Sequence, residues 1–345
     1  MNKTQMAKPK MEKPEKVKPQ KRPLKERIIT AFSTKKERKK LAKKGVRIVL
    51  KIFLYTFMVG LTFIILYPLL LQLAVAFRRP VDVNDPEVLW VPKVFSTENF
   101  KIAAIALKYW KALGNTLLNS TIIAILQVAS TAVAGYAFAR LHFKGSKFLF
   151  TLALFTIIVP QTMISLPMKI QLTEMGLIGK KYVLYLMSGL GMGIKSGIFI
   201  YLFRQFFKGI PVELEEAAYM DGASPIGVFF RVMLPNVKSG IITVALLAFV
   251  WQWNDFYFTN LFFVNNQADI YTLSTQQQAI IYGLESAVKE AKIWELMGQD
   301  ITSNVLFKSM IVNTAGIMVM LPLLIIYFFV QKLFVQGIER SGIVG

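Results

Sequence analysis

The chain reads Glu216-Ala217-Ala218-Tyr219-Met220-Asp221-Gly222-Ala223 within a polar segment, about 204–238, that interrupts an otherwise apolar sequence. Pro211 precedes this run and suits the first position of a helix, where the missing N–H costs nothing. Carboxylates in the first turns interact well with the positive end of a helix, and three follow here: Glu213, Glu215 and Glu216. Gly222 is placed to end this helix, because glycine closes helices in the left-handed conformation without strain.

A second short helix is predicted directly after the first. Ser224 suits its N-cap, Pro225 suits its first position, and Pro235 is expected to end it. The pattern predicts a helix–turn–helix in a loop between two membrane spans, with small residues at Ala217 and Ala218 where a partner can approach closely. By pattern alone, an amphipathic loop that merely connects two spans is an equal alternative.

The composition indicates an integral membrane protein. Hydrophobic residues make up 54% of the 345 residues and the mean hydropathy is +0.47, which is too apolar for an ordinary soluble domain. The chain has no cysteine and a single histidine, His142, which excludes a disulfide framework, a thiol nucleophile and a His-rich metal centre. We therefore expect no metal site and no resident cofactor.

The positive charge is concentrated at the N-terminus. The formal net charge is +21, and between Lys3 and Arg47 there are 18 Lys and Arg against four Glu, a net +14 that leaves +7 for the rest. Residues 1–46 repeat Lys-Pro pairs and have little apolar surface, so we expect a largely disordered cytoplasmic tail. It has one phenylalanine and no tyrosine or tryptophan to stack on bases. Anionic lipids are therefore its expected partner, rather than nucleic acid.

The remaining residues, 47–345, contain six apolar stretches long enough to cross a bilayer, which takes about 20 helical residues. They lie near 49–77, 115–139, 148–168, 182–203, 239–263 and 310–333. The predicted fold is all-α, a polytopic membrane domain with six transmembrane helices.

The distribution of Lys and Arg sets the expected orientation. With the N-terminus inside, the cytoplasmic loops and C-terminus hold nine of these residues and the outside loops hold twelve. The loops alone slightly favour the opposite topology, but the 18 cations before the first span outweigh them. We expect both termini in the cytoplasm, which places segment 204–238 there too.

Two polar sites inside the spans are candidates for a translocation path. Lys195 lies within the fourth span, where an ionisable group is costly unless it faces a cavity or a partner; lining a path and pairing structurally are equal alternatives. Nearby, Gly189, Gly193 and Gly197 recur every four residues and predict a smooth helix face for close packing. Lys195 also hints at an anionic saccharide as the substrate.

The second site is the stretch Trp251-Gln252-Trp253-Asn254-Asp255-Phe256-Tyr257, which interrupts the fifth span. Its candidate path residues are Trp253, Asn254, Asp255 and Phe256. Aromatic faces, amides and a carboxylate suit sugar recognition, since a sugar presents both C–H faces and hydroxyl groups. An interfacial aromatic belt is the alternative. We favour a path or a subunit interface.

No catalytic motif occurs in the spans. Gly189-Leu190-Gly191-Met192-Gly193-Ile194-Lys195-Ser196 superficially resembles a phosphate-binding loop, but Ile194 separates the glycines from Lys195 and Ser196. We therefore expect no ATP hydrolysis by this chain. Asp255 is the only carboxylate in the predicted spans, and ion-coupled carriers usually need more buried ionisable groups.

The polar segment resembles the "EAA" loop of ABC importer permeases in Glu216-Ala217-Ala218, Gly222 and Val232-x-Leu234-Pro235. The remaining chain is similar to the second permease subunit of carbohydrate importers of the maltose-type branch. The matching segments are Pro92-x-x-Phe95-Ser96-x-Glu98-Asn99-Phe100, Asn115-Thr116-x-x-Asn119-Ser120, Gly135-Tyr136-Ala137-Phe138-Ala139-Arg140, Phe143-x-Gly145, Pro160-x-x-Met163, Arg204-Gln205-Phe206-Phe207, Trp253-Asn254-Asp255-Phe256 and Gln331-Lys332-x-Phe334-Val335-x-Gly337.

The resemblance implies the type I permease fold in a bacterial cytoplasmic membrane. It implies a heterodimer with a paralogous permease subunit, two ATP-binding subunits that hold ATP and magnesium, and an extracellular solute-binding protein that delivers a carbohydrate. The residues expected to couple to the ATPase are Glu216, Ala217, Ala218, Asp221, Gly222, Ala223 and Pro235. Two features depart from the family: the 46-residue basic tail, and a C-terminus that lacks the usual Lys-Gly end.

Two other classes of function are open alternatives. An ion-coupled secondary transporter would use Asp255 and Lys195 and would work without an ATPase. A membrane-tethered scaffold would depend on the basic tail and transport nothing.

Overall fold

The computed structural model describes residues 35–85, 91–262, 271–293 and 301–342. These residues are predominantly helical, and none of them forms a β-strand, so the all-α class is confirmed. The chain divides into two compact units, residues 1–68 and 69–345. Most of the basic tail, residues 1–34, lies outside the described residues.

The described part of the first unit is a single helix, α2 (Lys35–Ala76), which continues into the second unit. It begins well before the predicted span 49–77 and runs through Pro68 without interruption, as membrane helices tolerate. The predicted domain boundary at 46/47 falls inside this helix and stays a prediction.

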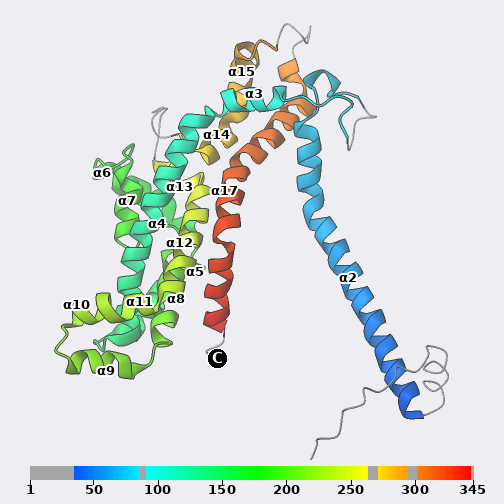
Figure 1. The fold of residues 1–345 in the computed structure, drawn as a ribbon. Coiled ribbons are helices and arrows are strands. Elements are labelled where there is room, and N and C mark those ends of the chain that lie inside the picture. Colours follow the sequence, from blue (N-terminus) through cyan, green and yellow to red (C-terminus); the bar gives the residue numbers. More distant parts are fainter. Residues whose placement is uncertain (1–34, 86–90, 263–270, 294–300, 343–345) are drawn as a thin grey trace, which may run out of the picture. The chain divides into compact units, whose positions relative to one another are not determined.

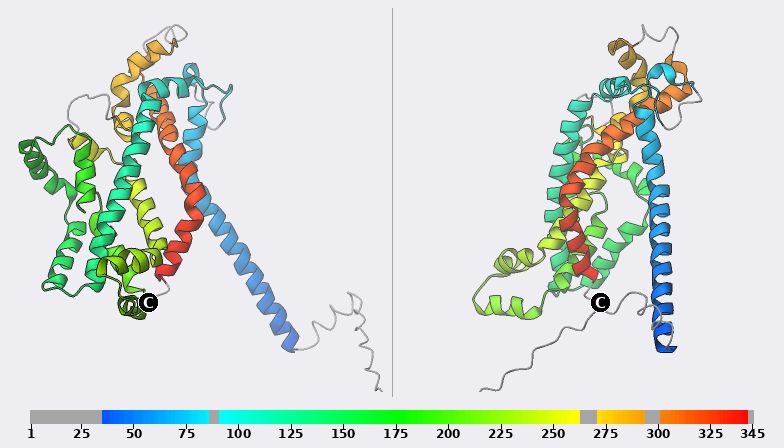
Figure 2. Two further views of the ribbon diagram at one scale, coloured as in Figure 1. Left: turned by 60° about the vertical axis from the view of Figure 1, so that its left-hand side comes forward. Right: turned by 45° about the vertical axis from the view of Figure 1, so that its right-hand side comes forward.

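The second unit is built around α4 (Tyr109–Arg140), which packs against α7 (Tyr182–Gly189), α8 (Ser196–Lys208) and α12 (Lys238–Trp253). On its other side α12 packs against α17 (Val305–Gly342) (Figures 1 and 2). The crossing of α4 and α8 is very close. A Cβ atom at Gly135 would lie 2.5 Å from the Cβ atom of Phe203 and 3.0 Å from the amide nitrogen of Arg204.

Short helices cover the N-terminal end of α4 (Figure 1). They are α3 (Glu98–Ala106), α14 (Leu273–Ala279) and α15 (Leu284–Glu290). The 3-10 helix η3 (Ile280–Gly283) joins α14 to α15, while η1 (Pro80–Asp82) precedes α3 and η4 (Ile301–Ser303) precedes α17. The hydroxyl oxygen of Thr116 on α4 accepts a hydrogen bond from the Leu273 amide at 2.8 Å. The opposite end of α4 meets α9 (Val212–Met220) and α10 (Pro225–Val228), so these two sets of helices lie at opposite ends of the unit.

The six predicted spans appear in different forms. Among the described residues, three helices are long and apolar enough to cross a membrane, Ala42–Ala76, Tyr109–Arg140 and Val305–Lys332, and two bent helix pairs raise the number to as many as five. The third predicted span is the bent pair α5 (Ser146–Ile158) and α6 (Gln161–Glu174). Pro160 separates them, because proline lacks an amide hydrogen and disfavours helix at the residue before it. The count of six stays a prediction.

The prediction of one continuous helix over 182–203 is wrong. Residues 190–195 separate α7 from α8, and Gly191 and Lys195 are both in the left-handed region, with φ of 73° and 61°. The three glycines therefore do not share one helix face. Close packing does occur at two of them: a Cβ atom at Gly193 would lie 2.5 Å from Gln127, and one at Gly197 would lie 2.7 Å from the Ala153 carbonyl oxygen.

Candidate functional site

The predicted helix–turn–helix is present, and Gly222 makes its turn. α9 begins after Pro211 and ends in a hydrogen-bonded closure: the Gly222 amide donates to the Tyr219 carbonyl oxygen and the Ala223 amide donates to that of Ala218, both at 3.0 Å. Gly222 has a φ of 81°, which only glycine adopts without strain. A Cβ atom there would meet nothing within 4 Å, so the backbone conformation, rather than crowding, favours glycine.

The second helix starts as predicted but does not end at Pro235. The Ser224 hydroxyl oxygen accepts a hydrogen bond from the Gly227 amide at 3.2 Å and caps α10. A short π-helix, η2 (Phe229–Met233), follows, and then the short α-helix α11 (Leu234–Asn236). Pro235 lies in the first turn of α11, where its missing N–H leaves no bond unmade. The chain then bends by 79° into α12.

The α9–α10 loop, which we define as Val212–Asn236, exposes a mixed polar and apolar face. Glu216, Ala217 and Asp221 are exposed on it. So are six large apolar side chains: Val212, Leu214, Tyr219, Met220, Ile226 and Phe230. By contrast, Ala218 and Ala223 face inward and pack against the cluster that contains Phe207, Phe229 and Met233. The predicted coupling residues thus divide between the outer face and its support.

One acidic residue of α9, Glu215, is buried and anchors the loop to α4. Its Oε1 atom accepts a hydrogen bond from the Tyr136 hydroxyl at 3.0 Å, and its Oε2 atom lies 3.5 Å from Nε of Arg140 in an ion pair. The side chains of Arg140 and Glu215 are 9% and 11% exposed. Arg140 also donates through Nη2 to the carbonyl oxygen atoms of Phe207, at 2.9 Å, and Ile210.

Sequence reasoning missed this junction. It gave Glu215 only one role, a favourable interaction with the positive end of its own helix. A signal was available, because Tyr136 and Arg140 are four residues apart and therefore share one face of α4. That face was not matched to α9, since spacing within one helix does not identify its partner in another.

The break between α7 and α8 forms a second candidate site, with Lys195 at its end. The amide of Gln127 on α4 donates from Nε2 to the Ile194 carbonyl oxygen at 2.8 Å and so satisfies backbone that the break leaves free. Lys195 lines two adjoining cavities of about 230 and 430 Å³. We call these together the Lys195 cavity.

Asp255 lines the same cavity as Lys195, so these two predicted path residues come together. The Asp255 carboxylate caps α13 (Tyr257–Phe262): Oδ1 accepts from the Phe258 amide at 3.1 Å, and Oδ2 accepts from the amide and the hydroxyl of Thr259 at 2.9 and 2.7 Å. Side-chain oxygen atoms commonly satisfy free amides in this way at the start of a helix.

The other predicted path residues do not line this cavity. Trp253 is fully buried, and its indole Nε1 donates to the Val319 carbonyl oxygen at 3.2 Å, which ties α12 to α17. Asn254 is exposed, with its amide donating to the Val250 carbonyl oxygen at 2.9 Å, and Phe256 is exposed beside it in the chain.

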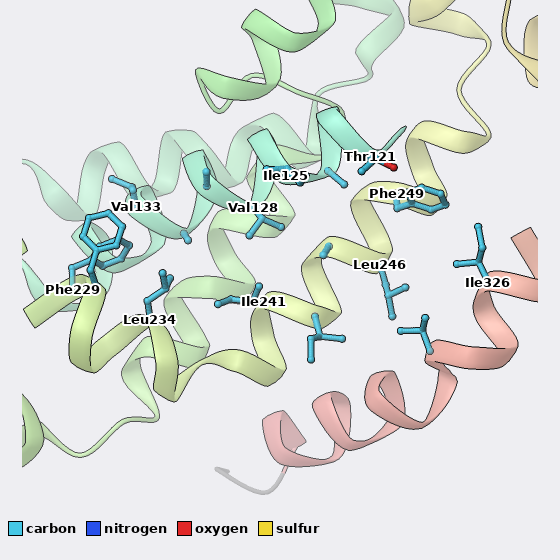
Figure 3. A pocket seen from close by; sticks show the side chains of 17 residues that line it. Thr121, Ile125, Val128, Val133, Phe229, Leu234, Ile241, Leu246, Phe249 and Ile326 are labelled. Atoms are coloured by element: carbon cyan, nitrogen blue, oxygen red, sulfur yellow. The ribbon is translucent and has the colours of Figure 1, made fainter. Parts of the chain in front are cut away.

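A third hollow is a groove of about 700 Å³ along α4, α12 and α17 (Figure 3). Side chains including Ile125, Val128, Ile241, Leu246 and Ile326 point into it, and of its lining residues only Thr121 carries a polar side-chain atom. Such a surface suits lipid chains or an apolar helix. It offers almost nothing that a saccharide hydroxyl could bond.

Comparisons with known proteins agree with this architecture. Residues 131–340 match the model of the family described as "Binding-protein-dependent transport system inner membrane component". The chain is 27% identical over 290 residues to the arabinooligosaccharides transport system permease protein AraQ of Halalkalibacterium halodurans, covering 83% of this chain and 93% of AraQ. It is 28% identical over 300 residues to the maltodextrin transport system permease protein MdxG of Bacillus subtilis, covering 87% and 98%.

A solved structure has a similar fold. It is the crystal structure of a bacterial ABC transporter involved in the import of the acidic polysaccharide alginate, with a TM-score of 0.66, 19% identity and coverage of 87% of this chain and 98% of the matched chain.

Proposed function

The chain belongs to the family of binding-protein-dependent transport system inner membrane components, and we propose that it is a permease subunit of an ATP-driven importer for oligosaccharides or related carbohydrates. The named relatives transport arabinooligosaccharides and maltodextrin. In this role the chain itself hydrolyses nothing, and ATP and magnesium are bound by partner subunits.

The observation that carries the proposal is the exposed face of the α9–α10 loop. It combines the carboxylate of Glu216, the small side chain of Ala217 and exposed apolar residues such as Met220. An exposed apolar surface rimmed by polar groups is typical of a protein–protein contact. We assign this face to docking on an ATPase subunit in the cytoplasm.

The buried anchor supports a mechanical role for the loop. Glu215, Tyr136 and Arg140 fix α9 to the C-terminal end of α4, and Arg140 also holds the end of α8. When ATP binding draws the two ATPase subunits together, a loop held in this way moves α4 and α8 with it. A loop that merely connected two spans would need no such junction.

The other partners follow from the same assignment. A paralogous permease subunit completes the path, two ATPase subunits lie in the cytoplasm, and a solute-binding protein delivers the sugar at the opposite end, where α3, α14 and α15 lie. Both termini are then cytoplasmic. The cations at the start of α2, including Lys43, Lys44 and Arg47, are exposed and suit anionic headgroups.

The Lys195 cavity is our proposed segment of the sugar path. It offers Lys195, Asp255 and aromatic and hydroxyl side chains, whereas the lining of the 700 Å³ groove contains no charged side chain and a single hydroxyl group, that of Thr121. Asn254 and Phe256 flank Asp255 in the chain and are exposed. They do not line the Lys195 cavity, so we propose them for an adjacent part of the path; Trp253 supports it from the core. The carboxylate of Asp255 already accepts three hydrogen bonds, which argues against the alternative of an ion-coupled carrier.

The substitution Gly222→Asp tests the coupling assignment. It adds a charge to the docking face and places a side chain at a φ of 81°. Because a Cβ atom there would meet nothing within 4 Å, we expect the protein still to fold and to stay in the membrane. ATP hydrolysis should then lose its stimulation by the sugar-loaded binding protein, and uptake should fall at least about tenfold, as expected when a contact worth about 1.4 kcal/mol is lost. Both rates are measured in proteoliposomes that contain the complete transporter.

Gly222→Asn is the matched control, because asparagine has the shape of aspartate without its charge and tolerates the left-handed region. We expect it to reduce uptake less. Normal stimulated hydrolysis and normal uptake in Gly222→Asp would refute the docking role.

A further inference from the structure

The break that carries Lys195 lies beside the middle of α4, which is long and apolar enough to cross a membrane. Gln127, which bonds to the Ile194 carbonyl oxygen, is 13 residues from the end of α4 at Arg140 and 18 from its start at Tyr109. At 1.5 Å per residue it is about 20 Å and 27 Å from the two ends. The backbone of Lys195 is therefore deep inside a span, where an ammonium group is costly unless it meets water, a counter-charge or a ligand.

Among the residues that the structure describes, no side-chain partner holds this ammonium group. Within residues 35–85, 91–262, 271–293 and 301–342, Lys195 has no ion pair and no side-chain hydrogen bond. Asp255 lines the same cavity, but its oxygen atoms bond to the start of α13. Lys195 is also exposed, so its positive charge is available to whatever enters the cavity.

The backbone of Lys195 adopts a conformation that is strained for any residue with a side chain. Lys195 has φ 61° and ψ 20° at the N-cap of α8, a conformation that glycine adopts without strain. Strained positions of this kind often belong to functional sites. The first helical amides of α8 follow Lys195 directly, and the positive end of a helix favours the same anionic group as the ammonium.

The surroundings suit a sugar as well as an anion. The cavity presents the hydroxyl groups of Thr156, Thr162 and Tyr257 and the indole of Trp251, which stacks on Phe199 with 5.3 Å between ring centroids. An indole offers a flat apolar surface to the C–H face of a sugar ring, and hydroxyl groups bond to its hydroxyl groups. The fixed charge distinguishes this cavity from one built only for neutral sugars.

We propose that the Lys195 cavity admits an acidic saccharide, an oligomer whose sugar units carry carboxylates, and that Lys195 pairs with a carboxylate as the saccharide passes. This inference rests on the proposed import function and names the substrate class of the same path. Lys195 is a specificity-determining residue: it favours the acidic saccharide over a neutral one of equal size.

The test uses the complete transporter in proteoliposomes with ATP enclosed. The probes are the trimer of galacturonic acid and the same trimer with its carboxyl groups reduced to alcohols, which differ only in charge and the acid oxygen atoms. Lys195→Gly removes the ammonium and also the backbone strain, so the variant should be as heat-stable as the parent. We expect uptake of the acidic trimer to fall about 10- to 100-fold, as for the loss of a charged hydrogen bond, and uptake of the reduced trimer to change less than about twofold, a change worth under half a kcal/mol.

Two further variants sharpen the result. Lys195→Arg keeps the charge and should keep most of the acidic uptake. Lys292→Gly also removes a lysine from a left-handed position, with φ 59°, at the opposite end of the unit from the α9–α10 loop, and should leave the ratio of the two uptake rates unchanged.

An equal fall for both trimers, an unchanged ratio in Lys195→Gly, or uptake of the reduced trimer alone by the parent would overturn the proposal. In each of these cases ATP-driven uptake of a saccharide persists in the parent, so the import function stands. Absence of any ATP-driven saccharide uptake in the parent would count against both.

Discussion

Glu215 and Glu216 are adjacent in α9 but lie in opposite environments. Glu216 is exposed on the proposed docking face, while Glu215 is buried between Tyr136 and Arg140. A buried ion pair gains little net stability over apolar packing, but removing one partner leaves an uncompensated charge. The two glutamates should therefore respond to the same substitution in different ways.

Glu215→Gln should destabilise the protein, by about 3 kcal/mol, the lower end of the range for breaking a buried pair. The lower end applies because Arg140 keeps its bonds to two backbone carbonyl oxygen atoms. The measurement is the thermal unfolding midpoint of the detergent-solubilised transporter.

Glu213→Gln is the matched control, because it makes the same chemical change at an exposed position of α9. It should alter stability by no more than about 0.5 kcal/mol. The double substitution Arg140→Met with Glu215→Leu removes both charges and should be less destabilising than the sum of its single substitutions. Equal midpoints for Glu213→Gln and Glu215→Gln would contradict the anchor.

At the scale of the helices, apolar stretches were predicted more reliably than their interruptions. The spans 115–139 and 310–333 are single helices, and the second runs through Pro322 without interruption. Pro160 indicates in the sequence the bend that the structure shows between α5 and α6. The break at residues 190–195 was not predicted, because its glycines were interpreted as a packing face of one continuous helix that also carried Lys195. Its free carbonyl group at Ile194 is satisfied from another helix, by Gln127, and one sequence does not show such a partner.

The crossing of α4 and α8 depends on Gly135. Gly135→Ala would place a Cβ atom 2.5 Å from the Cβ atom of Phe203 and 3.0 Å from the backbone nitrogen of Arg204. No rotamer change moves either atom, so the helices must separate. We expect a loss of about 1–3 kcal/mol, typical of overpacking, measured as a lower thermal unfolding midpoint.

Gly114→Ala makes the same substitution in the same helix, where a new Cβ atom would meet nothing within 4 Å. It should be neutral or stabilising by up to about 1 kcal/mol, the difference in helix propensity. A similar midpoint for both alanine variants would show that Gly135 does not set the distance between α4 and α8.

For the whole molecule, the sequence predicted the helical class, the family and the helix–turn–helix that closes at Gly222. It identified the residues of the outer face, Glu216, Ala217 and Asp221, because their types and spacing are local features. It missed the contacts that support this face from the inside: Ala218 and Ala223 pack inward, and Glu215 bonds to α4. Those contacts join residues that are up to 79 positions apart in the chain, and no local pattern specifies such pairs.

We propose that the α9–α10 loop meets an ATPase subunit in the cytoplasm, at the opposite end of the unit from α3 and α15. The chain has no cysteine, so a single introduced cysteine gives a specific attachment point. Ala217 is exposed on the proposed docking face, and Tyr282, 91% exposed, lies at the other end.

The most direct measurement is photo-cross-linking of the complete transporter after Ala217→Cys or Tyr282→Cys is labelled with a benzophenone maleimide. We predict that the probe at position 217 forms an adduct with the ATPase subunit and that the probe at position 282 does not. An ATPase adduct from position 282, or none from position 217 in a transporter that still imports saccharide, would contradict the assignment.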